Sequence, residues 1–187
     1  MTVPQHLTGI RLRTARYADV PELTALIETS ARTLQLADYT ALQIERALTT
    51  VYGVDSTLID DETYVTIEAE GRLVACGGWS RRGKLYGSDR YGHAHAGALD
   101  PAHDAAKIRA FFIDPDYARH GLGTLLLDEC ERRAHAAGFR QCELGATRTG
   151  VRLFEKRGYV AVRNEEVPLG DGITLPIVHM QKTFVTP

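Results

Sequence analysis

IRAFFIDPDYARHGLGTLLLDECERRAHAAGF, residues 108–139, is the most informative stretch of this chain. Its first six residues are apolar except for Arg109, which is typical of a strand, and Pro115 ends that strand because proline cannot donate to a sheet ladder. Apolar side chains then recur on one helical face over residues 122–137, and Gly138 is a typical residue after a helix end. The stretch therefore predicts a strand, a turn and a helix.

The turn between that strand and that helix contains Gly121 and Gly123. The first N–H groups of a helix have no internal partner, the helix dipole favours negative charge there, and glycines let a bulky anion approach the backbone. The pattern predicts a phosphate or pyrophosphate site, with a plain glycine-rich helix entry as the alternative. A P-loop is excluded because no Lys-Ser/Thr pair follows Gly123, and a dinucleotide-binding fingerprint because Leu126 stands where its third glycine belongs.

The rest of the chain extends this unit into a mixed α/β plan. Strands are predicted at 10–16, 63–68, 73–79, 108–113, 140–145, 159–166 and 173–181, and helices after Asp19, after Asp38, at 122–137 and at 149–157. Residues 80–105 are predicted to form a long loop. The element order is β-α-α-β-β-β-α-β-α-β-β, in one domain over residues 10–187 that follows an N-terminal extension, residues 1–9.

Composition excludes several classes of protein. The net charge of −2 over 187 residues argues against a nucleic-acid binder, and no apolar run is long enough to span a bilayer. The three cysteines, Cys76, Cys130 and Cys142, form no CxxC pair, which argues against a disulfide framework and a thiolate metal site. The start of the chain lacks the apolar core of a signal peptide. We expect a cytoplasmic protein without a nucleic-acid or membrane partner.

Two segments carry a family resemblance. Residues 108–139 resemble motif A of the GNAT superfamily of N-acetyltransferases, in which an apolar strand runs into V-x-P-x-x-R-x-x-G-x-G and then a Leu-rich helix. Residues 153–159, LFEKRGY, are similar to that superfamily's L-Y-E-K-x-G-F. The resemblance covers nearly the whole chain from Ile10. It implies a GNAT-like central mixed sheet with splayed middle strands flanked by helices, and acetyl-CoA (coenzyme A) as co-substrate with no metal.

The resemblance also implies how the cofactor is held. Backbone N–H groups of residues 119–124 would bind the pyrophosphate, and the backbone of residues 111–113 would pair with the pantetheine like an added strand. Strands 108–113 and 140–145 would splay apart, and an N–H near Phe112 or Ile113 would face the thioester oxygen. The implied cofactor-binding residues are Phe111, Phe112, Ile113, Arg119, His120, Gly121, Leu122, Gly123, Thr124, Thr147, Phe154 and Arg157.

The catalytic residues cannot be carried over in the same way. Phe154 stands where the superfamily often has a tyrosine proposed to protonate the leaving thiolate, and Thr147 where asparagine is common. Lys107 and Arg109 occupy the strand positions where relatives often carry a general base, and Arg cannot act as one. Loop residues Asp104, His103, His93 and His95 are alternatives. The catalytic residue stays unassigned, with Asp104 and Arg109 as candidates.

The acceptor site is predicted to include Trp79 and Arg109. The alternative to a place in the acceptor site is that Trp79 lies in the hydrophobic core. Strand alternation predicts that Arg109 shares a face with Phe111 and Ile113, opposite Ile108, Ala110 and Phe112. A buried guanidinium needs an anionic partner. That partner is either an internal acid such as Asp104, which makes Arg109 structural, or a carboxylate of the acceptor, which Arg109 would clamp.

These observations predict an acetyl-CoA-dependent N-acetyltransferase. A deprotonated primary amine, expected to belong to a small molecule, attacks the thioester directly in a ternary complex. Two alternatives stay open: an acyl-CoA-binding protein of the same fold with lost or weak catalysis, and a protein N-acetyltransferase. A homodimer is also left open.

Overall fold

The computed structural model describes residues 9–91 and 97–184 of the chain. Residues 1–8 of the predicted N-terminal extension, and the base candidates His93 and His95, lie outside the described residues. The elements are β1 (Arg11–Thr14), η2 (Tyr17–Asp19), α1 (Val20–Leu34), α2 (Ala41–Thr49), α3 (Ser56–Asp60), β2 (Tyr64–Ala69), β3 (Arg72–Ser80), β4 (Ala106–Ile113), η3 (Pro115–Tyr117), α4 (Leu122–Ala136), β5 (Gln141–Thr147), α5 (Arg148–Lys156), β6 (Val160–Gly170) and β7 (Ile173–Thr183).

The predicted mixed α/β order is confirmed, and the structure adds the short helix α3. Local chemistry explains most boundaries. Pro21 lies in the first turn of α1, and Thr40 and Gln43 form a reciprocal capping box at the start of α2. Asp55 caps α3 by accepting from the backbone N–H of Thr57 at 3.2 Å. A helix of five residues carries too little hydrophobic periodicity to be seen in the sequence.

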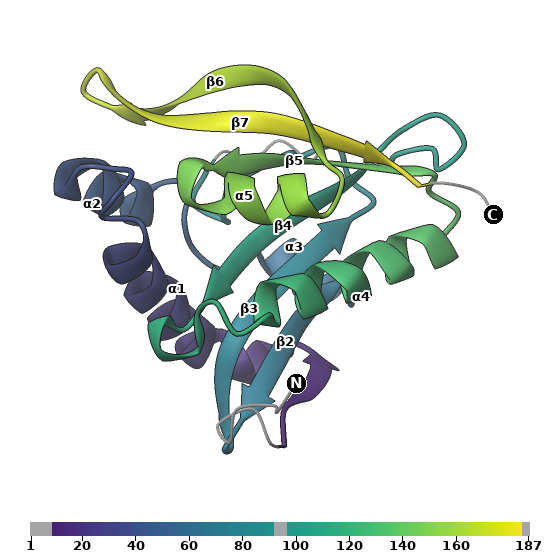
Figure 1. Cartoon of the computed structure of the whole chain (residues 1–187), viewed down its shortest axis with the longest axis horizontal. Coiled ribbons are helices and arrows are strands. Elements are labelled where there is room, and N and C mark those ends of the chain that lie inside the picture. The colour runs from purple at the N-terminus through teal and green to yellow at the C-terminus, as the bar shows by residue number, and fades with distance from the viewer. Residues whose placement is uncertain (1–8, 92–96, 185–187) are drawn as a thin grey trace.

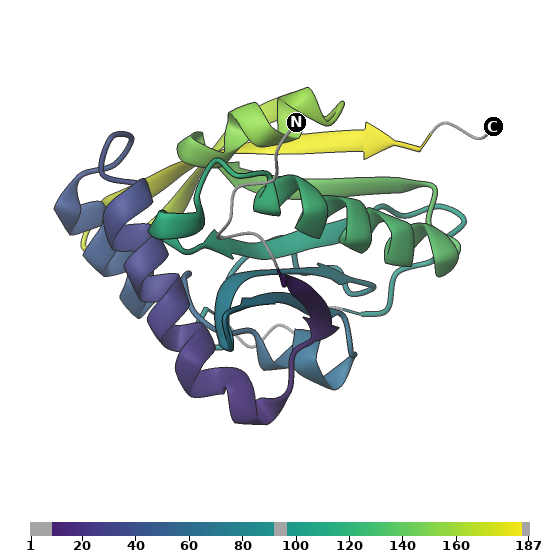
Figure 2. The ribbon, with the colours of Figure 1, turned by 60° about the horizontal axis from the view of Figure 1, so that its bottom comes forward.

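Seven strands form one sheet in the order β1-β2-β3-β4-β5-β7-β6. All neighbours are antiparallel except β4 and β5, which pair in parallel only at Ala106–Cys142 and Lys107–Glu143. Beyond that point the two strands diverge, so the predicted splay of the middle strands is confirmed. Helices α4 and α5 cover one face of the sheet, and α1 and α2 cover the other (Figures 1 and 2).

A β-bulge interrupts β4 at Ala110, whose φ is +57°. The pairing of β4 with β3 shifts there, because Cys76 lies opposite Phe112 and Gly78 opposite Arg109. The predicted alternation along this strand is therefore wrong after Ala110. Phe112 packs in the core beneath α1 and α2, whereas Phe111 packs against the core beneath α4 together with Ile113 and Ile108.

Gly77 makes the bulge compatible with the packing of Phe111. A Cβ at Gly77 would lie 2.6 Å from the Phe111 ring, so no larger residue fits opposite the bulge without moving that ring. The bulge thus turns Phe112 toward the face on which Arg109 lies. This places both side chains beside the gap between β4 and β5.

Candidate functional site

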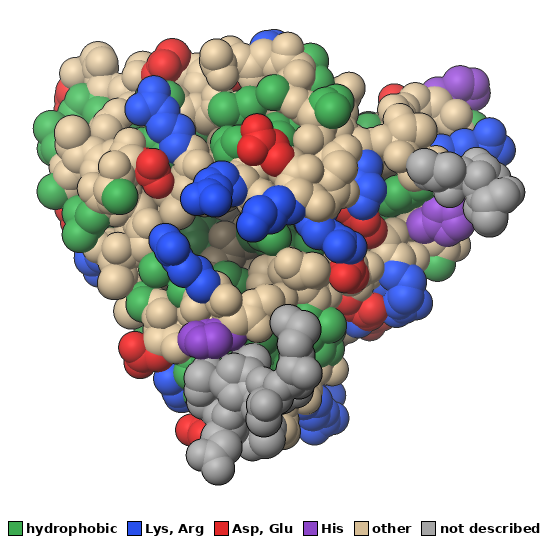
Figure 3. All heavy atoms as spheres, in the orientation of Figure 1, with side chains coloured by type: hydrophobic (Ala, Val, Ile, Leu, Met, Phe, Trp, Pro, Cys, Tyr) green, Lys and Arg blue, Asp and Glu red, His purple; other side chains and the backbone are tan. Residues whose placement is uncertain are grey.

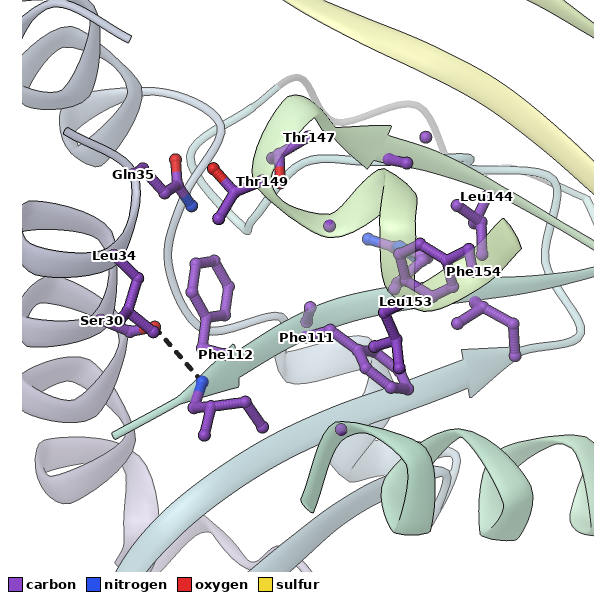
Figure 4. Close-up of a pocket in the computed structure, with 18 of the residues that line it drawn as sticks. Ser30, Leu34, Gln35, Phe111, Phe112, Leu144, Thr147, Thr149, Leu153 and Phe154 are labelled. Atoms are coloured by element: carbon purple, nitrogen blue, oxygen red, sulfur yellow. Dashed lines mark hydrogen bonds between the residues drawn. The ribbon is translucent and has the colours of Figure 1, made fainter. Parts of the chain in front are cut away.

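A cavity of about 660 Å³ lies where β4 and β5 diverge. Its walls come from the end of α1, the segments 51–53 and 85–87, β4, the turn before α4, β5, α5 and the β6–β7 hairpin. Figure 4 shows how side chains from α1, β4 and α5 surround it. The divergence of the two strands therefore creates a space that passes between elements far apart in the sequence.

One end of the cavity is the glycine turn, which we define as residues 119–124. Gly121 is the N-cap of α4 with φ +89°, Arg119 has φ +63°, and no side chain caps the helix. A Cβ on Gly121 would meet no atom within 4 Å, so its backbone faces open space, whereas a Cβ on Gly123 would lie 3.0 Å from Leu153. The turn presents uncapped helix N–H groups to the cavity, which is the arrangement that binds phosphate groups.

Positive charge surrounds this end. Arg119, Arg152 and Lys156 all line the cavity. In the space-filling view, Lys and Arg side chains gather around the hollow (Figure 3). The glycine turn and these cations fit a highly phosphorylated ligand, which supports the predicted anion site. Of the other predicted cofactor residues, Phe111, Phe112, Ile113, Leu122, Thr124, Thr147 and Phe154 also line the cavity, while His120 and Arg157 do not.

The β4 edge forms the middle of the cavity wall. The backbone N–H of Ile113 donates to Ser30 Oγ of α1 at 3.2 Å (Figure 4). A ligand carbonyl that binds at Ile113 must therefore compete with the Ser30 hydroxyl for this donor. The sequence could not show this contact, because Ser30 and Ile113 are separated by the whole β2–β3 hairpin.

The other end is the apolar chamber, which we define as Leu34, Gln35, Val51, Tyr52, Arg109, Phe112, Val167, Leu175 and Ile177. Six of these nine side chains are hydrocarbon. Phe112 and Tyr52 meet edge to face with ring centroids 5.5 Å apart, which fixes both rings. The lining of the chamber is thus largely apolar, with few polar groups.

Arg109 lies in the chamber as one half of a buried ion pair. Its Nη2 donates to Asp55 Oδ2 and, at 2.7 Å, to the carbonyl of Gly87. Both side chains are buried, and burial lowers the pKa of Arg109 to about 10, so it remains a cation at neutral pH. Asp104, the predicted partner, instead accepts from the backbone N–H of Asp100 at 2.7 Å. The expected internal acid exists, and it is Asp55.

Comparison with known proteins agrees with this geometry. The family model described as "Acetyltransferase (GNAT) domain" matches residues 36–184. The chain belongs to the GNAT acetyltransferase family. No curated protein sequence matches it significantly.

Several solved GNAT structures share the fold. A GCN5-related N-acetyltransferase from Rhodopseudomonas palustris aligns over 98% of this chain and 99% of its own, with 23% identity and a TM-score of 0.70. The PaiA N-acetyltransferase from Thermoplasma acidophilum, solved in complex with coenzyme A, aligns over 95% and 100%, with 15% identity and a TM-score of 0.65. A ribosomal-protein-alanine N-acetyltransferase from Brucella melitensis aligns over 93% and 99%, with 16% identity and a TM-score of 0.60.

Phe154, at the GNAT position discussed above, is buried in the cavity wall. Its ring meets Phe111 at 6.1 Å and Tyr159 at 5.7 Å between centroids, edge to face in both cases. It supplies packing and has no proton to donate. Arg157, three residues on, pairs with Asp128 on α4 at the surface. The second GNAT-like segment therefore braces α5 against β4 and α4.

No carboxylate or imidazole lines the cavity in the part of the chain that the structure describes. Lys107 pairs with Glu143, which also accepts from His179 Nε2 at 2.9 Å and Gln181 Nε2 at 2.8 Å. This cluster fastens β4, β5 and β7 together just below the splay. Asp104 does not line the cavity either, so neither the strand positions nor this loop residue places a general base against it.

Trp79 lies away from the cavity. It is buried on the α4 side of the sheet, where it meets Phe139 edge to face at 6.1 Å. Its predicted place in the acceptor site is not supported, because Trp79 is not among the residues that line the cavity. Within residues 9–91 and 97–184, no cluster of three or more His, Cys, Asp or Glu could hold a metal ion. No helix in those ranges has the length and apolar character needed to cross a membrane.

The sequence missed several polar residues of the site, among them Asp55, Gln35 and Ser30. Asp55 had a visible signal, because Asp followed by Ser56 and Thr57 is a helix cap pattern, but nothing linked it to Arg109. Ser30 lies on α1 and Gln35 is the C-cap of that helix, and no spacing in the sequence relates them to β4. All three become part of the site through contacts between distant segments.

Proposed function

We propose that this protein transfers an acetyl group from acetyl-CoA to the primary amine of a small molecule, by direct attack within a ternary complex. The observation that carries the proposal is the single cavity joining the glycine turn to the apolar chamber across the splay of β4 and β5. A two-ended cavity can hold a phosphorylated donor and a second substrate together, which converts a bimolecular reaction into a unimolecular one.

The residues on the donor side have distinct roles in this proposal. The N–H groups of the glycine turn bind the pyrophosphate, with Arg152 and Lys156 adding positive charge. The backbone of residues 111–113 pairs with the pantetheine, and an N–H on this edge stabilises the oxyanion of the thioester. Coenzyme A can leave as the thiolate, because a thiol with a pKa of about 8.5 is a tolerable leaving group. A thiolate that leaves unprotonated needs no general acid, so Phe154 is compatible with the proposed reaction.

The acceptor has to attack as the free amine. With no carboxylate or imidazole on the described cavity wall, the ammonium group loses its proton to water before the amine enters the chamber. The second proton, which the nitrogen releases as the tetrahedral intermediate collapses, passes to the departing thiolate or to water. The rate at a given acceptor concentration should then follow the fraction of free amine. An acyl-CoA-binding protein is the alternative function, because the described cavity wall holds no general base and Phe154 cannot act as a general acid.

The test is acetyl-CoA turnover against a mixed panel of amines, with acetylated products identified by mass spectrometry. The panel includes small aryl and alkyl amines and peptides with free N-termini and lysines. Product from a small amine above the amine-free background supports the proposal. If coenzyme A raises the melting temperature but no amine is acetylated, the protein is a binder. If only peptides are acetylated, it is a protein N-acetyltransferase.

A further inference from the structure

Gln35, at the C-terminal end of α1, has a fixed amide orientation. Its side chain is 6% exposed, and its Oε1 accepts from the Tyr52 hydroxyl at 2.7 Å. Burial raises the pKa of Tyr52 far above its usual value, so the phenol keeps the proton that it donates in this bond. Gln35 Oε1 is the acceptor of that proton. The Gln35 NH₂ group is consequently turned away from Tyr52.

Within the described residues this is the only side-chain hydrogen bond of Gln35, so none of them accepts from its NH₂ group. Gln35 lines the cavity, and in Figure 4 its amide nitrogen lies on the side of the Phe112 ring. A donor confined in a largely apolar space is satisfied when a ligand brings an oxygen to it. Gln35 is therefore a ready donor for an acceptor atom on a bound molecule.

The rest of the apolar chamber constrains what that molecule can be. Phe112, Leu175 and Ile177 provide hydrocarbon surface, and the described cavity wall contains no carboxylate to balance a fixed positive charge. The positive charge of Arg109 is already balanced by Asp55. A carboxylate on the ligand would thus enter this chamber without a counter-charge of its own, which is costly in an apolar site.

We propose that the chamber binds an amine with an apolar, otherwise uncharged body that carries one oxygen accepting a hydrogen bond from Gln35 Nε2. The inference rests on the proposed function for the reacting amine. Gln35 is in this view a specificity-determining residue, and Tyr52 positions it. Free amino acids are poor acceptors, because Arg109 is already paired with Asp55 and does not bind the carboxylate of a ligand.

The test compares two amines that differ at one atom. In para-methoxyphenethylamine an ether oxygen stands where para-ethylphenethylamine has a methylene group. Equilibrium binding of each amine to the full chain in the presence of coenzyme A is measured by calorimetry, and turnover with acetyl-CoA is measured alongside. O-methyltyrosine, which adds a carboxylate to the ether amine, is the third probe. Binding is read without catalysis, so a failure of acetyl transfer leaves this comparison intact.

We expect the wild type to bind the ether about 10-fold more tightly than the ethyl compound, the size of one hydrogen bond from a buried donor. Gln35→Leu should bind the two equally, and Tyr52→Phe should reduce the preference by freeing the amide to rotate. O-methyltyrosine should bind at least about 10-fold more weakly than the ether amine. A coenzyme A-dependent rise in melting temperature confirms that each variant is folded.

Three results would overturn the inference. One is equal binding of the ether and ethyl amines by the wild type. Another is an ether preference that survives Gln35→Leu in a variant that still binds coenzyme A. The last is O-methyltyrosine binding as tightly as the ether amine, which would show that the chamber accepts a carboxylate. Absence of turnover with all three probes would count against the proposed function alone.

Discussion

The glycine turn and the apolar chamber are the two ends of one cavity, but the first is formed by consecutive residues and the second by residues far apart in the sequence. The turn is six consecutive residues that present backbone N–H groups, whereas the chamber brings together side chains from Leu34 to Ile177. The turn needs one strand and one helix to be in place. The chamber needs the whole sheet, the bulge at Ala110 and a buried ion pair. Under the proposed function, binding of the donor would therefore depend on local structure, and choice of the acceptor on the complete fold.

The largest expected effect is the loss of coenzyme A binding after a substitution in the glycine turn. Gly121→Asp places a carboxylate at the proposed phosphate site and forces a side chain onto a residue with φ +89°. We expect the coenzyme A-dependent rise in melting temperature to vanish. In the wild type, a ligand at about 100 times its Kd stabilises by roughly 2.7 kcal/mol.

Gly170→Asp is the matched control, because Gly170 has the same φ of +89° and equally open surroundings in the β6–β7 turn. It carries the backbone strain without touching the cavity, and it should keep the shift. A Gly121→Asp protein that still responds to coenzyme A as the wild type does would show that the glycine turn is not the phosphate site.

In the apolar chamber, Arg109→Met should destabilise the fold by about 3–5 kcal/mol, because it leaves Asp55 buried without its partner. Urea unfolding measures this. Arg82→Met is the comparison, since Arg82 pairs with Asp61 at the surface and its loss should cost about 1 kcal/mol or less. Replacing both residues, as Arg109→Met with Asp55→Asn, should recover part of the stability. Equal effects of Arg109→Met and Arg82→Met would mean that the buried pair does not hold the chamber.

Charge pairs in the second half of α4 should have a smaller effect on stability. Hydrogen bonds from Arg132 and Arg133 lower the pKa of Glu129 on α4 to about 2 from its ordinary 4.5. A lowered carboxyl pKa stabilises the folded state above pH 4.5, and this contribution is lost as the pH falls through 2. Because the site is near the surface, we expect a loss of about 1 kcal/mol.

Urea unfolding between pH 5 and pH 2.5 tests this expectation against Glu129→Gln, which cannot titrate. The wild type should lose more stability over that interval than the variant does. Parallel curves for the two proteins would show that Glu129 contributes nothing through its charge.

The smallest expected effect is at Phe154, the motif position where the superfamily often carries a tyrosine. If the thiolate departs without an acid, Phe154→Tyr should change kcat by less than about 10-fold, below the ~10²–10⁴-fold typical of general-acid catalysis. Steady-state turnover with a saturating amine measures this. An inactive wild type that Phe154→Tyr turns into an active enzyme would favour the acyl-CoA-binding alternative.

The sequence alone determined the parts of this protein that depend on neighbouring residues. Hydrophobic periodicity placed the strands and the long helices, and Gly121 and Gly123 marked the helix entry, because these signals lie within a few residues of one another. The same locality explains why the GNAT resemblance was visible in residues 108–139. It also predicted that a buried Arg109 needs an anionic partner, and Asp55 is that partner.

Only the tertiary structure decided which residues meet. One extra residue at Ala110 reverses the faces of Phe111 and Phe112, and a bulge depends on the partner strand, where Gly77 leaves room. The partner of Arg109 is Asp55, 54 residues away, and not the nearer Asp104. Gln35 meets Tyr52, and Trp79 faces α4, for the same reason. Sheet register and helix packing fix such contacts, and neither is encoded in the spacing of a single segment.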